Sequence, residues 1–192
     1  MKFEEMIEKD FSGCISVVKK EIVIFEKSYG YADLSNKIPN KLNTKFATAS
    51  AGKVFVAVAI LQLIESGKLS FDDTIGNLLD FDLKEIDTRI TVRQLLCHTS
   101  GIPDYFDESI MSEYGELWQD YPNYKIRKSS DLIPLFINKP MMHQSGESFQ
   151  YNNTGFVVLG LIIEKLTGQL FDEYLKSLFL SLVICWTQDI MN

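Results

Sequence analysis

The chain has 192 residues, 46% of them hydrophobic and 12% aromatic, which is enough apolar material to bury a core of about one domain. Its net charge of −7 argues against binding to nucleic acid or to an anionic membrane, because phosphate groups are held by clustered Lys and Arg. Residues 1–10 contain four acidic side chains and no apolar core, unlike a secretory signal, and no uncharged run reaches the roughly 18 residues of a membrane span. We therefore expect a cytoplasmic protein without a transmembrane segment.

Two short strands are predicted over residues 11–18 and 22–29, on either side of a charged turn. The first strand region contains Ser16, three residues before Lys19. Because strand positions three apart point to opposite faces, these two side chains cannot share a site. A two-stranded ribbon is marginal in isolation, so we expect exposed apolar surface along its free edge.

An apolar helix is predicted over residues 50–65, ending at Ser66 and Gly67. Ser50 and Lys53 lie in its first turn on one face, because helical residues three apart are neighbours. The unpaired N–H groups and partial positive charge of a helix N-terminus favour an anionic nucleophile and an oxyanion beside it. A Ser-x-x-Lys tetrad in this place predicts a nucleophile with its own amine; the alternative is a serine that only caps the helix.

The rest of the chain is predicted to be mostly helical after a loop with short helical turns over 70–83. Helices are expected from Thr91 to about His98, over 130–138, from Thr154 to Leu166 with Gly168 closing it, and over 170–182. The first of these begins with a capping box formed by Thr91 and Gln94. Residues 104–128 are aromatic and acidic, and we favour a loosely packed helical insertion over a substrate-facing lid.

Tyr151 and Asn153 lie in a turn directly before the helix that begins at Thr154, so they offer a phenol and an amide at one place. The alternative for Tyr151 is a capping or packing role. A second Tyr-x-Asn spacing, at Tyr121 and Asn123, lies in a polar stretch broken by a proline and is predicted to be a surface turn.

The cysteines and histidines do not predict a metal site or a cofactor. Cys14, Cys97 and Cys185 are scattered and odd in number, which favours reduced thiols over a disulfide framework. Cys97 and His98 are adjacent and do not face each other on a helix, so we expect a buried cysteine and a histidine that anchors a loop. With His143 far from both, no ligand spacing for a metal is present.

Several ordered segments together resemble one family. These segments are Phe11–Gly13, Gly30–Asp33, Phe46–Lys53, Ile90–Pro103 and Asn152–Gly160. From about Phe11 to Tyr174, the chain resembles the serine β-lactamase-related family, which includes class C β-lactamases, D-alanyl-D-alanine peptidases, penicillin-binding proteins and esterases. The resemblance implies an α/β (α+β) fold of the β-lactamase/transpeptidase type, with a helical region inserted in an antiparallel-sheet domain.

The resemblance also implies a role for each candidate residue. Ser50 would attack an amide or ester carbonyl and form an acyl-enzyme, with its backbone N–H as one oxyanion donor. Lys53 would accept the serine proton or pass it on. Tyr151 would relay that proton and later activate water for deacylation. Asn153 would orient the lysine and bind the substrate.

The family pattern also has a third motif, a Lys- or His-led triad ending in Gly, and no such segment follows Tyr174. Residues 181–184 differ from the family's Pro-Leu-Gly-Met as well, which predicts a truncated or frame-altered end. We therefore expect one truncated domain over 1–192, incomplete at its C-terminus, with a hairpin and nucleophile helix in 1–66 and a mostly helical 67–192. In this family the C-terminal strands share a sheet with the hairpin, and the nucleophile helix packs on it. The resemblance therefore implies that one side of the helix over 54–64 is uncovered here and exposes apolar surface.

The expected function is that of a serine hydrolase or acyl-transferase acting on a small molecule or peptide, namely a β-lactam, a D-alanyl peptide or an ester. Its turnover is expected to be weak, because loss of one oxyanion donor costs about 10² to 10³ in rate. The alternative is a non-catalytic fragment that at most binds β-lactams or is acylated by them.

Overall fold

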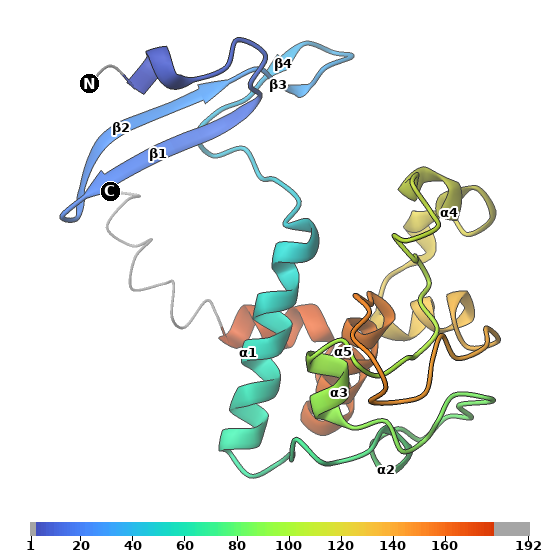
Figure 1. Ribbon diagram of the computed structural model, residues 1–192. Coiled ribbons are helices and arrows are strands. Elements are labelled where there is room, and N and C mark those ends of the chain that lie inside the picture. The colour runs from blue at the N-terminus through green and yellow to red at the C-terminus, as the bar shows by residue number, and fades with distance from the viewer. Residues whose placement is uncertain (1–2, 179–192) are drawn as a thin grey trace. The chain divides into compact units, whose positions relative to one another are not determined.

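A computed structural model describes residues 3–178, which divide into two compact units on either side of the Ala49–Ser50 bond (Figure 1). Within the described residues, the first unit contains one short 3₁₀ helix and two antiparallel strand pairs. Its elements are η1 (Phe3–Met6), β1 (Gly13–Lys19), β2 (Ile22–Tyr29), β3 (Tyr31–Asp33) and β4 (Ile38–Pro39). The pairing of β1 with β2 confirms the predicted hairpin. That the whole chain forms a single domain stays a prediction.

The hairpin turns at Lys20 and Glu21, whose φ angles are 49° and 67°. Two consecutive residues with positive φ are typical of the type I′ turn, whose twist matches that of the paired strands. Ser16 pairs with Glu26 in this ribbon and is exposed, so the first Ser-x-x-Lys spacing lies in a strand as predicted. The ribbon also has the expected exposed apolar side chains. They are Val18, Ile22, Val23 and Ile24.

The second unit begins with a 3₁₀ turn, η2 (Ala49–Ala51), that leads into α1 (Gly52–Glu65). The helix ends at Ser66, whose backbone N–H donates to the Gln62 carbonyl; Gly67 follows with φ 72°, and its N–H donates to the Ile64 carbonyl. One face of α1 is buried, through Val56, Ala59, Ile60 and Leu63. Val54 and Leu61 are 63% and 46% exposed, which confirms the expected exposed apolar side of this helix.

The remaining elements are short, apart from one long helix. They are α2 (Ile75–Leu78), α3 (Val92–Leu96), α4 (Tyr114–Asp120), η3 (Asn123–Lys125), η4 (Ser129–Leu135) and α5 (Thr154–Thr167). The predicted capping box is present at the start of α3, where the Thr91 and Gln94 side chains each bond the other's backbone N–H. The helix expected over 130–138 is the 3₁₀ helix η4, which ends at Leu135 and contains Pro134, whose nitrogen has no hydrogen to donate.

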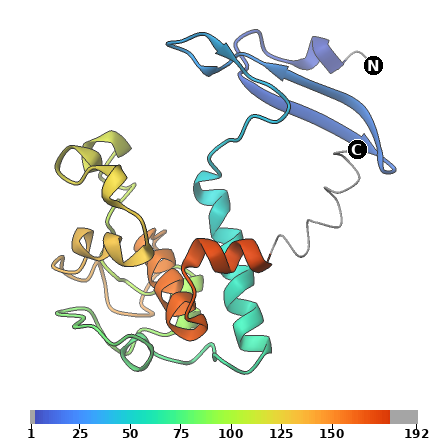
Figure 2. The same cartoon turned by 180° about the vertical axis from the view of Figure 1, so that it is seen from behind.

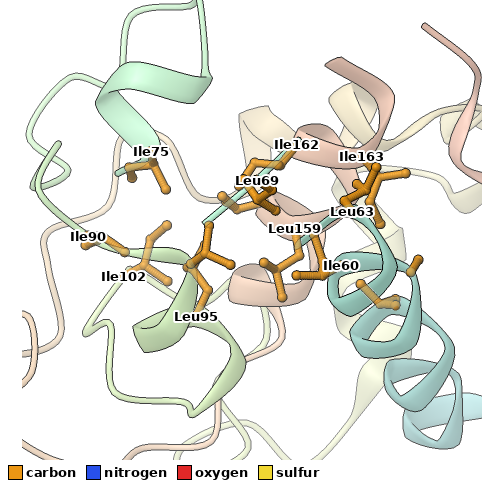
Figure 3. Packing of buried hydrophobic residues seen from close by; sticks show 14 of the residues in the cluster. Ile60, Leu63, Leu69, Ile75, Ile90, Leu95, Ile102, Leu159, Ile162 and Ile163 are labelled. Atoms are coloured by element: carbon orange, nitrogen blue, oxygen red, sulfur yellow. The ribbon is translucent and has the colours of Figure 1, made fainter. Parts of the chain in front are cut away.

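The core of the second unit surrounds α5. Helices α1 and α3 and the turn η4 all pack against it, and α5 is buried on most of its circumference, from Val158 to Ile163. Figure 3 shows Ile60 and Leu63 of α1 beside Leu159 and Ile163 of α5. The short helix α2 and the loops before and after α3 complete this core. Ile75 comes from α2, and the loops contribute Leu69, Ile90 and Ile102.

The helix α5 ends at Gly168, which has φ 70° and takes the left-handed conformation that a helix C-terminus favours. A further helical segment, Phe171–Leu178, follows at a bend of 77° (red in Figure 2). It confirms the described part of the helix expected over 170–182; Cys185 and residues 181–184 lie outside the described residues. Among residues 3–178 no single helix has the length and apolar character to cross a membrane, although this bent pair passes that test by length and composition together.

The packing of α1 on α5 can be tested with two substitutions on adjacent residues. Ile60 is fully buried, so Ile60→Ala is expected to lower the free energy of unfolding by about 2–5 kcal/mol. Leu61 points to the opposite, exposed side, so Leu61→Ala is expected to change it by no more than about 0.5 kcal/mol. Urea denaturation of the three proteins measures both effects; equal losses would contradict this docking of α1.

Candidate active site

The packing of α1 against α5 brings the four predicted site residues together. The Tyr151 hydroxyl donates to Ser50 Oγ at 2.7 Å, and Lys53 Nζ lies 3.1 Å from the same oxygen. Lys53 Nζ also donates to Asn153 Oδ1 at 2.8 Å. All four belong to the second unit, although Ser50 and Tyr151 are 101 positions apart in the chain. The structure therefore places an alcohol, an amine, a phenol and an amide in one hydrogen-bonded group.

The local sequence explains how α1 presents the first two residues. Ser50 lies in the turn η2, directly before the helix, and Lys53 follows in the first helical turn on the same face. The residue at the N-cap is Ala51, and no side-chain cap hydrogen bond is made there. The capping alternative for Ser50 is therefore wrong. Its hydroxyl oxygen instead accepts from Tyr151 and Lys53.

Two aromatic rings flank the ammonium group of Lys53. Its Nζ lies 4.9 Å from the centre of the Tyr151 ring and 5.8 Å from that of Phe156. A cation is attracted to the negative face of such rings. With Asn153 as its acceptor, Lys53 is half-buried and held against Ser50 instead of extending into solvent.

The loop before α5 is held in place by Asn152, which is buried. Its Oδ1 accepts from the Gly155 N–H at 2.8 Å, and its Nδ2 donates to the Ile102 carbonyl at 2.7 Å. These bonds satisfy one orphan donor of the helix N-terminus and join the loop to the segment after α3. Because the backbone on both sides of Asn152 is fixed, Tyr151 and Asn153 face the lysine from defined positions.

The ring of His98 packs against that of Tyr151. Its ring centre lies 4.6 Å from that of Tyr151 and 5.2 Å from that of Phe156, and its Nδ1 accepts the Asn152 backbone N–H at 3.1 Å. Burial, and next the positive charge of Lys53, lower the pKa of the His98 imidazole below its usual value of 6.5. The predicted loop-anchoring role of His98 is confirmed by its bond to the Asn152 backbone. Tyr151 packs against this ring, as its alternative role required, and it also contacts Ser50.

Two other predictions from the sequence have different outcomes. The expectation of a buried Cys97 is wrong, because the thiol is exposed. The apolar face of α3 is carried by Val92 and Leu95, and a residue two positions beyond Leu95 points away from that face. The second Tyr-x-Asn spacing is a surface turn as predicted. The Tyr121 hydroxyl donates to the Asp131 carbonyl, and Asn123 is exposed at the start of η3.

Asp104 is part of this region, although the sequence analysis did not select it. It is only 4% exposed, and its carboxylate accepts from the backbone N–H groups of Asn153 and Thr154 at 2.8 and 3.0 Å. The one available signal was a single acidic residue after the apolar Gly101–Pro103 segment. Nothing in that pattern connects it with a residue 49 positions later.

The arrangement meets the geometric requirement for nucleophilic catalysis by serine. A nucleophile must lie within hydrogen-bonding reach of a base, and that base must itself be oriented by a third group. Ser50 contacts two groups that can exchange protons, and Asn153 orients one of them. Among the described residues, no group of His, Cys, Asp and Glu side chains could hold a metal ion.

Sequence comparison places the chain among known proteins. A model of the Beta-lactamase family matches residues 4–183. The chain is 33% identical over 183 residues to penicillin-binding protein 4* of Bacillus subtilis (strain 168), which covers 93% of this chain and 38% of that protein. It is 32% identical over 169 residues to protein flp of Staphylococcus aureus (strain NCTC 8325 / PS 47), covering 86% of this chain and 32% of that protein.

Solved structures show the same relationship. The chain resembles a penicillin-binding protein from Bacillus halodurans with a TM-score of 0.77 and 42% identity, over 85% of this chain and 48% of that one. It resembles the D-amino acid amidase from Ochrobactrum anthropi SV3 with a TM-score of 0.65 and 26% identity, over 84% of this chain and 42% of that one.

The chain spans from about a third to about half of the length of these relatives. The matched region contains every element that carries the site, from η2 to α5. The predicted β-lactamase/transpeptidase-like fold is confirmed by these structures. On this match the chain belongs to the beta-lactamase family, and it is homologous to penicillin-binding proteins and D-amino acid amidases.

Proposed function

We propose that this chain forms an acyl-enzyme at Ser50 from compounds with a reactive amide or ester carbonyl. Membership of the family points to serine acyl-transfer or hydrolysis. The observation that carries the proposal is the position of Ser50 Oγ, which lies within hydrogen-bonding distance of both Tyr151 and Lys53. A serine hydroxyl is a poor nucleophile unless a neighbouring group removes its proton, and two such neighbours are in contact with it.

In the proposed reaction, Ser50 Oγ forms a bond to the carbonyl carbon and the hydroxyl proton leaves along one of its two contacts. With Lys53 as the neutral amine, its Nζ takes the proton, either directly or by way of the Tyr151 hydroxyl, which gives up its own proton as it accepts that of Ser50. The same groups return a proton to the leaving nitrogen or oxygen as that bond breaks. Negative charge develops on the former carbonyl oxygen. The backbone N–H of Ser50, at the N-terminal end of α1, is the proposed donor to it.

The proposed substrates follow from the relatives and from the exposure of the site. The relatives include proteins named for penicillin binding and a D-amino acid amidase, which suggests β-lactams, D-alanyl peptides and simple D-configured amides or esters. Ser50 is exposed, so its oxygen is open to attack an incoming carbonyl, whereas Lys53 and Tyr151 are half-buried behind it. A small molecule or the end of a peptide fits this arrangement.

Labelling with a fluorescent penicillin tests the nucleophile. We expect covalent labelling of the chain and its loss in Ser50→Ala, because Ser50 Oγ is the oxygen that both Tyr151 and Lys53 contact. Ser16→Ala is the matched control, since Ser16 also precedes a lysine by three residues but lies in a strand. Intact-mass measurement follows the adduct with time: a transient adduct indicates hydrolysis, and a persistent one indicates a protein that is acylated without turnover. Undiminished labelling of Ser50→Ala would refute the assignment.

The two proton-exchanging groups are tested by their removal. Lys53→Met and Tyr151→Phe are each expected to lower the rate of labelling by about 10² to 10⁴, the usual contribution of a positioned acid or base. Tyr124→Phe serves as the control, because Tyr124 is 66% exposed on η3. Stopped-flow or quenched labelling at several penicillin concentrations gives the second-order rates. Rates equal to that of the unmodified chain would remove both residues from the mechanism.

The lowered pKa of His98 predicts that acid destabilises the site. Since the unfolded imidazole binds a proton at a higher pH than the folded one, the free energy of unfolding should fall as the pH drops below 6.5, towards the lowered folded-state pKa. His98→Gln should flatten this part of the curve. Urea denaturation between about pH 8 and about pH 5 measures the slopes. Parallel curves for the unmodified chain and His98→Gln would show that burial does not disfavour the charged imidazole.

A further inference from the structure

We propose that Asp104 is a positioning residue of this site, because its carboxylate sets which end of the Asn153 amide faces Lys53. The inference rests on the proposed function for its effect on labelling. Asp104 does not contact Ser50 or Lys53 through any hydrogen bond that the described residues show. It would act through Asn153 alone.

The bonds of the Asn153 side chain show why its orientation matters. Its Nδ2 donates to Asp104 Oδ2 at 3.3 Å and to the Phe106 carbonyl at 3.0 Å. Both partners can only accept hydrogen bonds. Its Oδ1 is then left to accept from Lys53 Nζ at 2.8 Å. A half-turn of the amide would place its oxygen against a carboxylate and a carbonyl, and its NH₂ group against an ammonium ion. All three bonds would be lost.

The carboxylate is itself held in one place. Asp104 Oδ2 accepts the Asn153 backbone N–H at 2.8 Å, so the same oxygen contacts both the backbone and the side chain of that residue. Its Oδ1 accepts from the Thr154 N–H at 3.0 Å and from the Thr154 hydroxyl at 3.2 Å. A negative charge at the N-terminus of α5 is favoured by the helix dipole and by these unpaired N–H groups. These hydrogen bonds offset the cost of burying the carboxylate charge and fix its position.

A purely structural role is the competing explanation, in which Asp104 only caps α5. The two explanations differ in their consequences. If Asp104 only caps the helix, its loss lowers stability, and labelling falls only as the folded fraction falls. If it orients Asn153, its loss frees the amide to turn, Lys53 loses its acceptor, and labelling falls even in fully folded protein.

Asp104→Asn and Thr154→Val separate these cases. Asp104→Asn keeps the size of the side chain but replaces one carboxylate oxygen with an NH₂ group. An NH₂ group cannot accept a hydrogen bond from Asn153 Nδ2. Thr154→Val removes hydroxyl bonds to the same carboxylate and to the Tyr105 N–H, and leaves the Asn153 amide untouched. We expect both variants to be less stable than the unmodified chain. Only Asp104→Asn is expected to be labelled more slowly per folded molecule, by about ten- to hundred-fold, which is the usual effect of losing a hydrogen bond to a charged group.

Equal slowing of labelling per folded molecule in Asp104→Asn and Thr154→Val would overturn the proposal in favour of a capping role.

A measurement on the unmodified chain keeps the inference testable whatever the variants or the labelling do. The Asn153 side-chain NH₂ protons should exchange slowly with solvent by NMR, because both are bound in a buried place. They should remain slow in Thr154→Val and become fast in Asp104→Asn. An unmodified chain that is not labelled would refute the proposed function, while slow exchange would still support the role of Asp104. Fast exchange in the unmodified chain would overturn that role, even if labelling occurs.

Discussion

The apolar contact between α1 and α5 is the interaction on which the whole site depends. Ser50 and Lys53 are fixed to the start of α1, and Tyr151 and Asn153 to the loop that enters α5. Neither pair is held near the other by the chain itself, since about a hundred residues separate them. Burial of Ile60 and Leu63 in one core with Leu159 and Ile163 supplies the energy that keeps both helix starts together. The polar groups then need only short-range bonds to complete the geometry.

Buried polar groups beneath the N-terminus of α5 fix the positions of Tyr151 and Asn153 more closely than the apolar packing alone. Asn152 and Asp104 together satisfy the N–H groups of Asn153, Thr154 and Gly155. Such groups would be costly to bury without partners, so their bonds resist displacement of the loop. His98 adds a neutral ring that packs against Tyr151 without placing a second positive charge beside Lys53. The exposed nucleophile is thus supported by a layer of buried, hydrogen-bonded groups.

The sequence predicted the parts of this molecule that depend on local patterns. The helix at Gly52–Glu65, the β1–β2 hairpin and the capping box of Thr91 follow from residues a few positions apart, and so does the shared face of Ser50 and Lys53. The family resemblance supplied the pairing of that face with Tyr151. Asp104 was missed because its partners are 49 and 50 positions away and its neighbours form no motif. Cys97 was placed wrongly because, two positions beyond Leu95, it points away from the apolar face of α3.

The same contacts explain why residue 153 is an amide. The position must accept from an ammonium ion on one side and donate to a carboxylate on the other, and only an amide offers both functions in a side chain of this length. An aspartate there would face Asp104 with like charge and could donate nothing. A hydroxyl would lack the second donor that the Phe106 carbonyl takes up. Asn153 is therefore a neutral connection between a buried anion and the cation beside Ser50, and it brings the two charges into one network without placing them in contact.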